Sequence, residues 1–376
     1  MTIWSYPTRI RFGVGEIKEL ATEVLQLRTS RVLLVTDPGV LQAGLVAPVV
    51  SQLERANIAV SVFDSLEPNP VEADAERGAA ADAAHHADVL VALGGGAPLD
   101  TAKLIAVRTR TSEDFQRLDD ALGGDRLIPG DLPSVVAIPT TAGTGSEVGR
   151  AAVVTVKATG RKTVIFSPAM LPRVAILDPE LTLGLPAAVT AATGYDALTH
   201  CLEAYAATGD HPMADGIALR GLELVAEALP VAYATGSDVL ARGAMQKAAM
   251  MGAVAFQKGL GACHAMAHPL SSECGVHHGL ANAICLPAVV EFNMEAARET
   301  YARVAPLFNG RRAEDLPDRL RRLREQLGLA SSLAEVGVGP EKFPRLVELA
   351  LQDASHHQNP RACAAEDFQR LFERCA

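Results

Sequence analysis

The feature that most constrains the fold is a regular alternation of short apolar runs and helix-forming segments through the first half of the chain. Apolar runs occupy residues 31–36, 60–63, 89–93 and 135–138, and helical patterns lie beyond Gly39, over 71–86 and after Pro98. Strands that alternate with helices predict a parallel sheet with helices packed on its faces. The first half is therefore predicted to be an α/β domain.

Beyond residue 184 the pattern changes to long Ala- and Leu-rich segments with helical periodicity and hardly any β-branched runs. This change predicts an all-helical second half. We place the boundary near Gly184, with an α/β domain over residues 1–184 and a helical domain over residues 185–376. Residues 311–324 are rich in Arg, which favours a solvated surface for that stretch.

The composition limits the possible partners and the location of the protein. The 376 residues are 49% hydrophobic and carry a net charge of −10, whereas nucleic-acid binding would call for a basic face. The amino terminus lacks the pattern of a signal peptide, and no stretch approaches the roughly 20 apolar residues of a membrane span. We expect a cytoplasmic protein that binds neither nucleic acid nor membrane. Its six cysteines include no Cys-x-x-Cys pair and are expected to be reduced.

An apolar strand over residues 88–93 runs into a glycine turn and a helix start. The segment runs to Lys103, and its residues that could serve a ligand are Gly94, Gly95, Gly96, Ala97 and Asp100. Glycines let backbone amides approach a ligand closely, and the free N–H groups at a helix start favour a phosphate or diphosphate. The turn is not Gly-x-Gly-x-x-Gly, and a tight strand-to-helix turn could use the same glycines for steric reasons alone.

A second loop, over residues 139–147, follows another predicted strand and is rich in hydroxyl groups and glycine. Side chains that could donate to the same diphosphate are Thr140, Thr141 and Thr144. An ordinary loop of Gly, Thr and Ser would have the same composition.

The strand over residues 32–36 ends in a carboxylate, Asp37. An Asp at this position can accept a hydrogen bond from a ribose 2′-hydroxyl, and its charge would repel a 2′-phosphate. This interpretation favours NAD over NADP. The alternative is that Asp37 only opens the Asp-Pro-Gly turn, because Asp is a favoured turn starter.

Two clusters of potential metal ligands lie in the second half. Asp196 and His200 are four residues apart, as are His264 and His268, and His278 follows ten residues later. Residues four apart share one face of a helix and can point at the same ion. Imidazole and carboxylate together suit a borderline cation such as iron(II) or zinc, whereas calcium or magnesium prefers oxygen ligands. A single His on a helix usually has no ligand role, so the clustering carries the prediction.

These motifs, in their order and spacing, resemble the iron-containing (group III) alcohol dehydrogenases along nearly the whole chain. The matching segments are residues 94–103, 139–147, 196–200 and 264–279. The resemblance implies a Rossmann-like dinucleotide-binding domain and a metal held by Asp196, His200, His264 and His278. It implies that His268 lies beside the substrate and the nicotinamide, where it takes part in positioning or proton transfer, although spacing alone pairs it with His264. His277 has no role that the resemblance assigns.

The resemblance extends to further residues. It implicates Asn69 in the wall of the nucleotide cleft, Lys162 near the cofactor, and Phe256 as an apolar wall of the substrate site. Ala97 stands where relatives often have Ser, so one phosphate hydrogen bond is lost and weaker cofactor binding is expected. Arg150, directly after the second loop, would bind the carboxylate of a hydroxy acid if it faces the site; an ordinary surface Arg is the alternative.

These features together predict an NAD(H)-dependent, divalent-metal-dependent oxidoreductase that interconverts an alcohol with an aldehyde or ketone by hydride transfer. The metal, Fe²⁺ or Zn²⁺, would act as a Lewis acid in the cleft between the two domains. The alternatives are a maleylacetate-reductase-like enzyme, a hydroxy-acid dehydrogenase, and a lyase like dehydroquinate synthase, which would need basic residues for a phosphate-bearing substrate. Relatives of this kind form homodimers or higher homo-oligomers.

Overall fold

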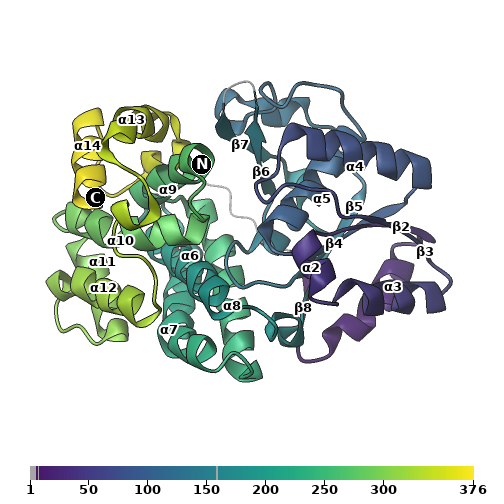
Figure 1. Cartoon of the computed structure of the whole chain (residues 1–376), viewed down its shortest axis with the longest axis horizontal. Coiled ribbons are helices and arrows are strands. Elements are labelled where there is room, and N and C mark those ends of the chain that lie inside the picture. The colour runs from purple at the N-terminus through teal and green to yellow at the C-terminus, as the bar shows by residue number, and fades with distance from the viewer. Residues whose placement is uncertain (1–5, 7, 158–159) are drawn as a thin grey trace. The chain divides into compact units, whose positions relative to one another are not determined.

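The computed structural model describes residues 6, 8–157 and 160–376 of the chain (Figure 1). It divides into two compact units, one made of Tyr6–Thr141 and Gly145–Gly184 and the other of Ala142–Thr144 and Leu185–Ala376. The first unit carries the sheet and the second is helical. Across the described residues, no helix combines the length and apolar character that crossing a membrane requires.

The first unit is built on a parallel six-stranded sheet with the order β1-β8-β5-β4-β2-β3. Its strands are β1 (Arg9–Phe12), β2 (Arg31–Val35), β3 (Ala59–Phe63), β4 (Val89–Gly94), β5 (Ser134–Pro139) and β8 (Val174–Leu177). All six residues of β4 are buried, because helices cover both faces of the sheet. This double burial is the reason that the central strands are continuous apolar runs rather than alternating ones.

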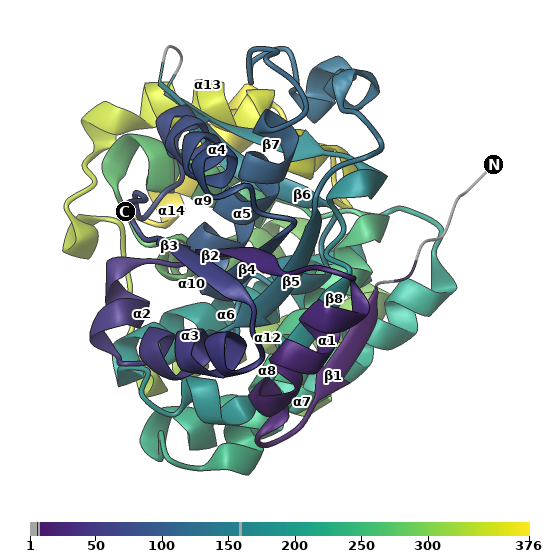
Figure 2. The ribbon, with the colours of Figure 1, turned by 90° about the vertical axis from the view of Figure 1, so that its right-hand side faces the viewer.

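Helices lie on both faces of the sheet (Figure 2). One face packs against α1 (Leu20–Gln26), α2 (Pro38–Gln42) and α3 (Val46–Arg55), and the other against α4 (Glu72–His85) and α5 (Gly96–Arg108). Successive residues of β2 enter opposite cores: Leu34 packs in the α3 core, and Val35 packs in the α5 core. The sheet therefore separates two apolar cores, as strand geometry requires.

The predicted fold class is confirmed, but several elements were not predicted. β1 and β8 extend the sheet, and β6 (Ala151–Val156) pairs with β7 (Arg161–Phe166) as an antiparallel hairpin. β1 forms the edge of the sheet and is rich in Arg, so it lacks an apolar run. Helix α5 begins at Gly96, ahead of Pro98, because Pro is tolerated in the first turn, where its missing N–H has no intrahelical partner.

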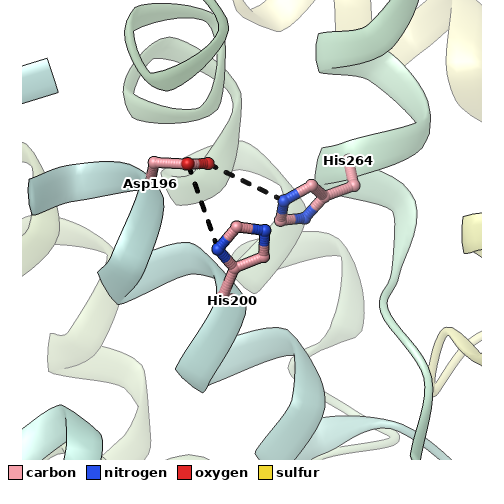
Figure 3. A group of neighbouring side chains, drawn as sticks. All are labelled: Asp196, His200 and His264. Carbon is pink, nitrogen blue, oxygen red and sulfur yellow. Dashed lines mark ion pairs between the residues drawn. The ribbon is translucent and has the colours of Figure 1, made fainter. Parts of the chain in front are cut away.

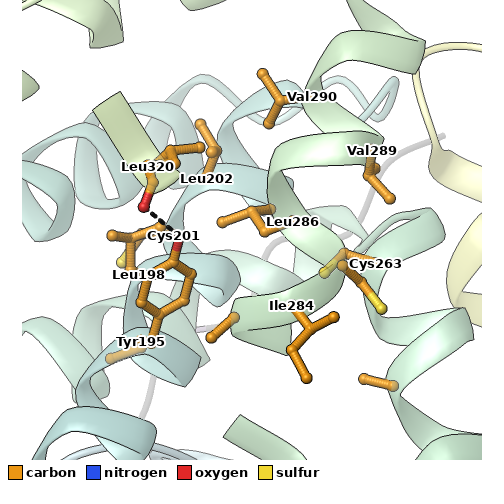
Figure 4. Packing of buried hydrophobic residues seen from close by; sticks show 14 of the residues in the cluster. Tyr195, Leu198, Cys201, Leu202, Cys263, Ile284, Leu286, Val289, Val290 and Leu320 are labelled. Carbon is orange, nitrogen blue, oxygen red and sulfur yellow. Dashed lines mark hydrogen bonds between the residues drawn. The ribbon is translucent and has the colours of Figure 1, made fainter. Parts of the chain in front are cut away.

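In the second unit, buried apolar side chains of α6 and α10 pack together in the core (Figure 4). The helices are α6 (Ala187–Ala206), α7 (Pro212–Ala234), α8 (Val239–Ala255), α9 (Ala262–Cys274), α10 (His278–Asn293), α11 (Arg298–Val304), α12 (Leu316–Gln326), α13 (Phe343–Gln352) and α14 (Ala365–Arg374). The hydroxyl of Tyr195, fully buried on α6, donates to the Leu320 carbonyl oxygen at 3.1 Å. α6 is buried along most of its length and therefore can present side chains to an enclosed site.

The prediction of a solvated surface for residues 311–324 is wrong at Arg324. This residue lies on α12 and is 6% exposed, and its guanidinium approaches the carbonyl oxygens of Ala283 and Ile284 at 3.4 Å. Pro287 lies inside α10 and has no N–H to donate to the Ala283 carbonyl oxygen four residues earlier. Arg324 is buried because it supplies the donor that Pro287 lacks.

Candidate metal centre and nucleotide turn

Asp196, His200 and His264 form a buried group whose potential ligand atoms all lie within 4.8 Å of one another (Figure 3). Asp196 and His200 are one turn apart on α6, and His264 comes from α9. Asp196 Oδ2 lies 4.0 Å from His200 Nδ1, and Asp196 Oδ1 lies 3.9 Å from His264 Nε2. These distances are too long for hydrogen bonds. They leave room for an ion that all three residues can bind.

The two facing nitrogens, His200 Nδ1 and His264 Nε2, are buried and have no hydrogen-bond partner among the described residues. A buried polar atom without a partner is costly, and such atoms are rare in folded proteins. Burial lowers the pKa of His200 to about 4, so the ring is neutral and offers the lone pair that a metal requires. The three residues therefore fit a divalent cation.

His278 lies at the start of α10, with its Nε2 3.4 Å from Asp196 Oδ1. It is more exposed than the other three residues. Asp196 thus faces three imidazoles from three different helices. The structure brings together all four residues that the family resemblance implied as ligands.

His268, one turn after His264 on α9, has a different partner. Its Nδ1 lies 2.6 Å from Asp353 Oδ2, and its ring stacks on that of His278 with 5.3 Å between centroids. Burial opposes the ionisation of Asp353, but the charge of His268 and its hydrogen bond hold the pKa of Asp353 well below its usual range. His268 is therefore held by a carboxylate at the margin of the group.

Three residues that orient the group were missed from the sequence: Glu203, Asn282 and Asp353. Glu203 Oε2 accepts from His264 Nδ1 at 2.6 Å, and the Asn282 amide donates to Asp196 Oδ1 at 2.8 Å. Although burial disfavours its charged form, the hydrogen bond and charge of Glu203 raise the pKa of His264. Glu203 is seven residues after Asp196 and Asn282 is four after His278. Helical spacing therefore placed both on the ligand faces of their helices.

Close helix packing around the group depends on two glycines. A Cβ at Gly279 of α10 would lie 2.1 Å from the Ala192 carbonyl oxygen and 3.3 Å from Asp196 Cβ on α6. A Cβ at Gly252 of α8 would lie 2.9 Å from His200 Cβ. Any side chain at these positions would push the ligand-bearing helix α6 away from its neighbours.

Phe256, predicted as an apolar wall, follows α8 and packs its ring against His200, with 5.2 Å between centroids. It is half-buried. An apolar ring at this point limits the access of water to His200.

The glycine turn lies at the carboxyl ends of the central strands. Gly94 has φ of 151°, and a Cβ there would lie 2.6 Å from Pro98 Cγ, so both conformation and space call for glycine. Gly95 caps α5, and Gly96 and Ala97 form its first turn. The Thr140 N–H donates to the Gly94 carbonyl oxygen at 2.9 Å and joins the two predicted loops. The first N–H groups of α5 are thus presented at this edge of the sheet.

Asp37 has the turn-opening role that the sequence offered for it, and its second oxygen is turned toward Gly94. Its Oδ1 accepts from the Val40 N–H at 2.9 Å, which caps α2. Its Oδ2 lies 3.4 Å from the position a Cβ would take at Gly94. The carboxylate therefore opens the turn with one oxygen and faces the glycine turn with the other.

Of the remaining predicted cofactor residues, Thr141 and Thr144 lie on the second loop, whereas Asn69 and Lys162 lie elsewhere in the chain. Thr141 lies against Gly95, whereas Asn69 is exposed between β3 and α4. Thr144 is grouped with the helical unit. Lys162 is half-buried on β7; burial raises the pKa of Asp100, and the charge of Lys162 offsets a small part of that rise.

Asp100 and Lys103 are tied to the protein itself. The Ser146 hydroxyl donates to Asp100 Oδ1 at 2.6 Å, and the Val153 N–H donates to Asp100 Oδ2 at 3.0 Å. The ammonium of the fully buried Lys103 donates to both oxygens of Ser146 and to the Ala151 carbonyl oxygen. Burial raises the pKa of Asp100 and lowers that of Lys103 to about 8. These two residues fasten the second loop to α5.

Arg150 is half-buried, and its Cζ lies 5.2 Å from the centroid of the Phe166 ring. Burial lowers its pKa. Within the described part of the chain, no carboxylate forms an ion pair with it. The guanidinium is therefore partly desolvated and has no counter-charge from a carboxylate there.

Two sequence models of one protein family match nearly the whole chain. Residues 7–179 match the sequence model described as "Iron-containing alcohol dehydrogenase", and residues 190–376 match "Fe-containing alcohol dehydrogenase family, C-terminal". The chain therefore belongs to the iron-containing alcohol dehydrogenase family and is an oxidoreductase.

Three relatives illustrate the similarity. A 4-hydroxybutyrate dehydrogenase from Cupriavidus necator is 38% identical over 98% of both chains. An NAD-dependent methanol dehydrogenase from Bacillus methanolicus is 35% identical over 99% of both. The solved structure of a 1,3-propanediol oxidoreductase superposes with a TM-score of 0.95 and 36% identity over the whole of both chains. The relatives share the family but differ in the substrates in their names.

Proposed function

We propose that this protein is an NAD- and metal-dependent alcohol dehydrogenase. The observation that carries the proposal is the pair of buried imidazole nitrogens that face Asp196 and have no hydrogen-bond partner in the described part of the chain. A bound divalent ion supplies a Lewis acid for an alcohol or carbonyl oxygen, and NAD supplies the hydride acceptor. The chain's own residues hold and orient these groups.

The ion is held by Asp196, His200, His264 and His278. One carboxylate and three neutral imidazoles suit iron(II) or zinc. Asn282 and Glu203 keep the carboxylate and one imidazole in place through hydrogen bonds of 2.8 and 2.6 Å. The arrangement is preorganised, because the ligand atoms already face one another.

His268 acts on the substrate rather than on the metal. A carboxylate can only accept hydrogen bonds, so Asp353 holds the proton on His268 Nδ1 and leaves Nε2 to contact the substrate or carry a proton. His268→Ala should lower turnover while the metal content stays at the wild-type level. Loss of metal in this variant would instead make His268 a ligand.

NAD is bound by the glycine turn and the first turn of α5, with Thr140 and Thr141 beside it. Asp37 disfavours a 2′-phosphate through its charge, and the methanol dehydrogenase relative is NAD-dependent by name. Asp37→Ala should bring the catalytic efficiencies for NADH and NADPH closer together. An unchanged ratio would leave Asp37 with its capping role alone.

The decisive experiment follows NADH absorbance with a panel of alcohols, hydroxy acids, aldehydes and keto acids. The protein is assayed as isolated, after treatment with a chelator, and after addition of Fe²⁺ or Zn²⁺. We expect net NADH turnover that is lost with the metal and restored by it. Persistent activity in metal-free protein would contradict the metal role, and absence of net NADH turnover would favour a lyase that uses NAD transiently.

For the substrate, we propose a small hydroxy acid whose carboxylate binds Arg150. The support is the half-buried guanidinium without an ion-pair partner among the described residues, and one relative is named as a 4-hydroxybutyrate dehydrogenase. Arg150→Ala should raise KM for hydroxy acids at least about tenfold, the usual range for a lost charged hydrogen bond, and leave neutral alcohols unaffected. Equal efficiencies for both classes in both proteins would remove this proposal and leave a neutral alcohol.

A further inference from the structure

Glu203 is a buried carboxylate behind His264, on the side away from Asp196. It is 6% exposed. Its Oε2 lies 2.6 Å from His264 Nδ1, and its Oε1 accepts from the Cys263 N–H at 2.7 Å. No Lys or Arg of the described residues forms an ion pair with it, and His264 is its partner. A buried negative charge without a cationic partner calls for an explanation, because its desolvation is costly.

The start of α9 supplies part of the explanation. The N-cap of this helix is Gly261, which has no side chain to cap it. Glu203 accepts from the Cys263 N–H in its place, and the Asn359 amide oxygen accepts from the Ala262 N–H at 3.1 Å. A helix N-terminus favours a nearby anion. Helix capping alone, however, does not require the short bond to the His264 ring.

We propose that Glu203 belongs to the metal centre as a positioning residue that sets the affinity for the ion through His264. This inference rests on the proposed metal site. Because a carboxylate only accepts, the proton of the neutral His264 ring must stay on Nδ1, and Nε2 keeps its lone pair toward Asp196, 3.9 Å away. The negative charge behind the ring also makes Nε2 a stronger donor to a cation.

His200 provides an internal contrast. Its ring is hydrogen-bonded to the backbone of Gly143, a neutral group. Of the two buried imidazoles in the group, His264 alone is backed by a carboxylate. A change at Glu203 therefore removes a hydrogen bond from His264, whereas it acts on His200 only through charge.

The absence of a side chain at Gly261 keeps this position open. A Cβ there would lie 2.6 Å from Glu203 Oε1 and 2.8 Å from Asn359 Oδ1. Gly261→Ala would displace the carboxylate while preserving its charge. This variant separates the position of the carboxylate from its presence.

The chain offers a matched control, because a second carboxylate–imidazole pair has the same 2.6 Å length. That pair is Asp353 with His268, which lies on a histidine outside the proposed ligands. The experiment measures Co²⁺ affinity by visible absorption, in competition with a chelator, for wild type and for the variants Glu203→Gln, Glu203→Asp, Gly261→Ala, Asp353→Asn and Asp196→Asn. The Co²⁺ spectrum reports on the ligand set independently of activity.

We expect Glu203→Gln to bind Co²⁺ about 10- to 100-fold more weakly, the usual effect of removing an outer partner of a metal ligand. Gly261→Ala should weaken binding in the same direction, and Glu203→Asp should recover part of the loss. Asp353→Asn should bind as wild type does. Wild-type Co²⁺ affinity in both Glu203→Gln and Gly261→Ala would overturn the inference and leave Glu203 as a helix cap, visible only as lower thermal stability.

Asp196→Asn separates a failure of this inference from a failure of the metal site. If Asp196→Asn binds Co²⁺ as tightly as wild type, the metal site itself is wrong. A second readout uses the Zn²⁺-loaded protein, where each carboxylate-bound imidazole N–H should give a downfield proton signal. Glu203→Gln should remove one such signal and Asp353→Asn the other. Retention of both signals in Glu203→Gln would also contradict the inference.

Discussion

Each unit of this protein buries a cluster of ionisable groups, and the two clusters are satisfied in opposite ways. In the α/β unit, Lys103 and Asp100 use their polar atoms on Ser146 and on the backbone. In the helical unit, His200 and His264 each leave one buried nitrogen without a hydrogen-bond partner among the described residues. Burial alone therefore does not identify a functional site. The orientation of unsatisfied atoms toward a common point does.

The difference also separates stability from function. A satisfied buried cluster stabilises a loop, and removing one partner leaves the others unpaired. An unsatisfied cluster lowers the stability of the apoprotein and is maintained because a ligand completes it. Substitutions in the satisfied cluster should therefore lower the free energy of unfolding and leave metal affinity unchanged. Substitutions of the proposed ligands should lower metal affinity and leave the apoprotein as stable as wild type.

The largest effect is expected for Lys103→Met. Loss of the ammonium removes one donor from each of the two oxygens of Ser146 and from the Ala151 carbonyl oxygen, and it removes the cation that faces Asp100 and Glu147. The free energy of unfolding should fall by about 3 to 5 kcal/mol, measured by urea denaturation or calorimetry. Co²⁺ affinity should not change. If Lys103→Met is as stable as wild type, the hydrogen bonds of Lys103 do not stabilise the second loop.

Asp196→Asn should lower metal affinity without lowering the stability of the apoprotein. Its Co²⁺ affinity should fall by more than the roughly 100-fold upper effect of an outer partner, because a proposed ligand itself loses its charge. The apoprotein should be as stable as wild type or more so, since a buried carboxylate becomes neutral. Calorimetry with and without metal checks both points. A large loss of stability in the apoprotein would make Asp196 a structural residue like Lys103.

Glu147→Gln tests the pH dependence of the satisfied cluster. Burial raises the pKa of Glu147 from 4.5 to about 7, so the folded protein holds this proton more tightly than the unfolded chain. The wild type should therefore lose stability as the pH rises from 4.5 to 7, by up to about 3 kcal/mol. The variant lacks this loss, and the difference between the two proteins should grow over that window. Parallel pH profiles of thermal unfolding would contradict the raised pKa.

The smallest effect is expected for Ala97→Ser, in the first turn of α5. A hydroxyl at this position could donate one more hydrogen bond to a phosphate, worth about 0.5 to 1.5 kcal/mol. The Kd for NAD should fall by about 2- to 10-fold, as measured by calorimetric titration. Co²⁺ affinity serves as the control and should stay constant. An unchanged Kd would mean that the backbone N–H groups already satisfy the phosphate.

The helices and strands that could be predicted are those in which every residue has the same degree of burial, so that the sequence of the element shows one uniform pattern of apolar residues. The apolar run at 89–93 corresponds to β4 (Val89–Gly94), which is buried on both faces. β1 was not predictable, because only one neighbour and partial solvent exposure shape its sequence. Arg324 was assigned to the surface because nothing local reveals that it serves a carbonyl group freed by Pro287 in another helix.

The sequence by itself determined which chemical groups are available and which of them share a helix face. Four-residue spacing alone placed Asp196 beside His200. Local patterning likewise predicted the strand, turn and helix around Gly94, since each of these features depends on neighbours in the chain.

Four-residue spacing puts His264 and His268 on the same face of α9 and does not distinguish them, so only the tertiary structure shows which neighbours each histidine meets. Residues four apart on a helix differ by about 6 Å along its axis and 40° around it, so they share a stripe but meet different neighbours. α9 packs so that His264 meets Asp196 and Glu203, whereas His268 meets Asp353. These partners lie far away in sequence, and long-range packing alone assigns each histidine its environment.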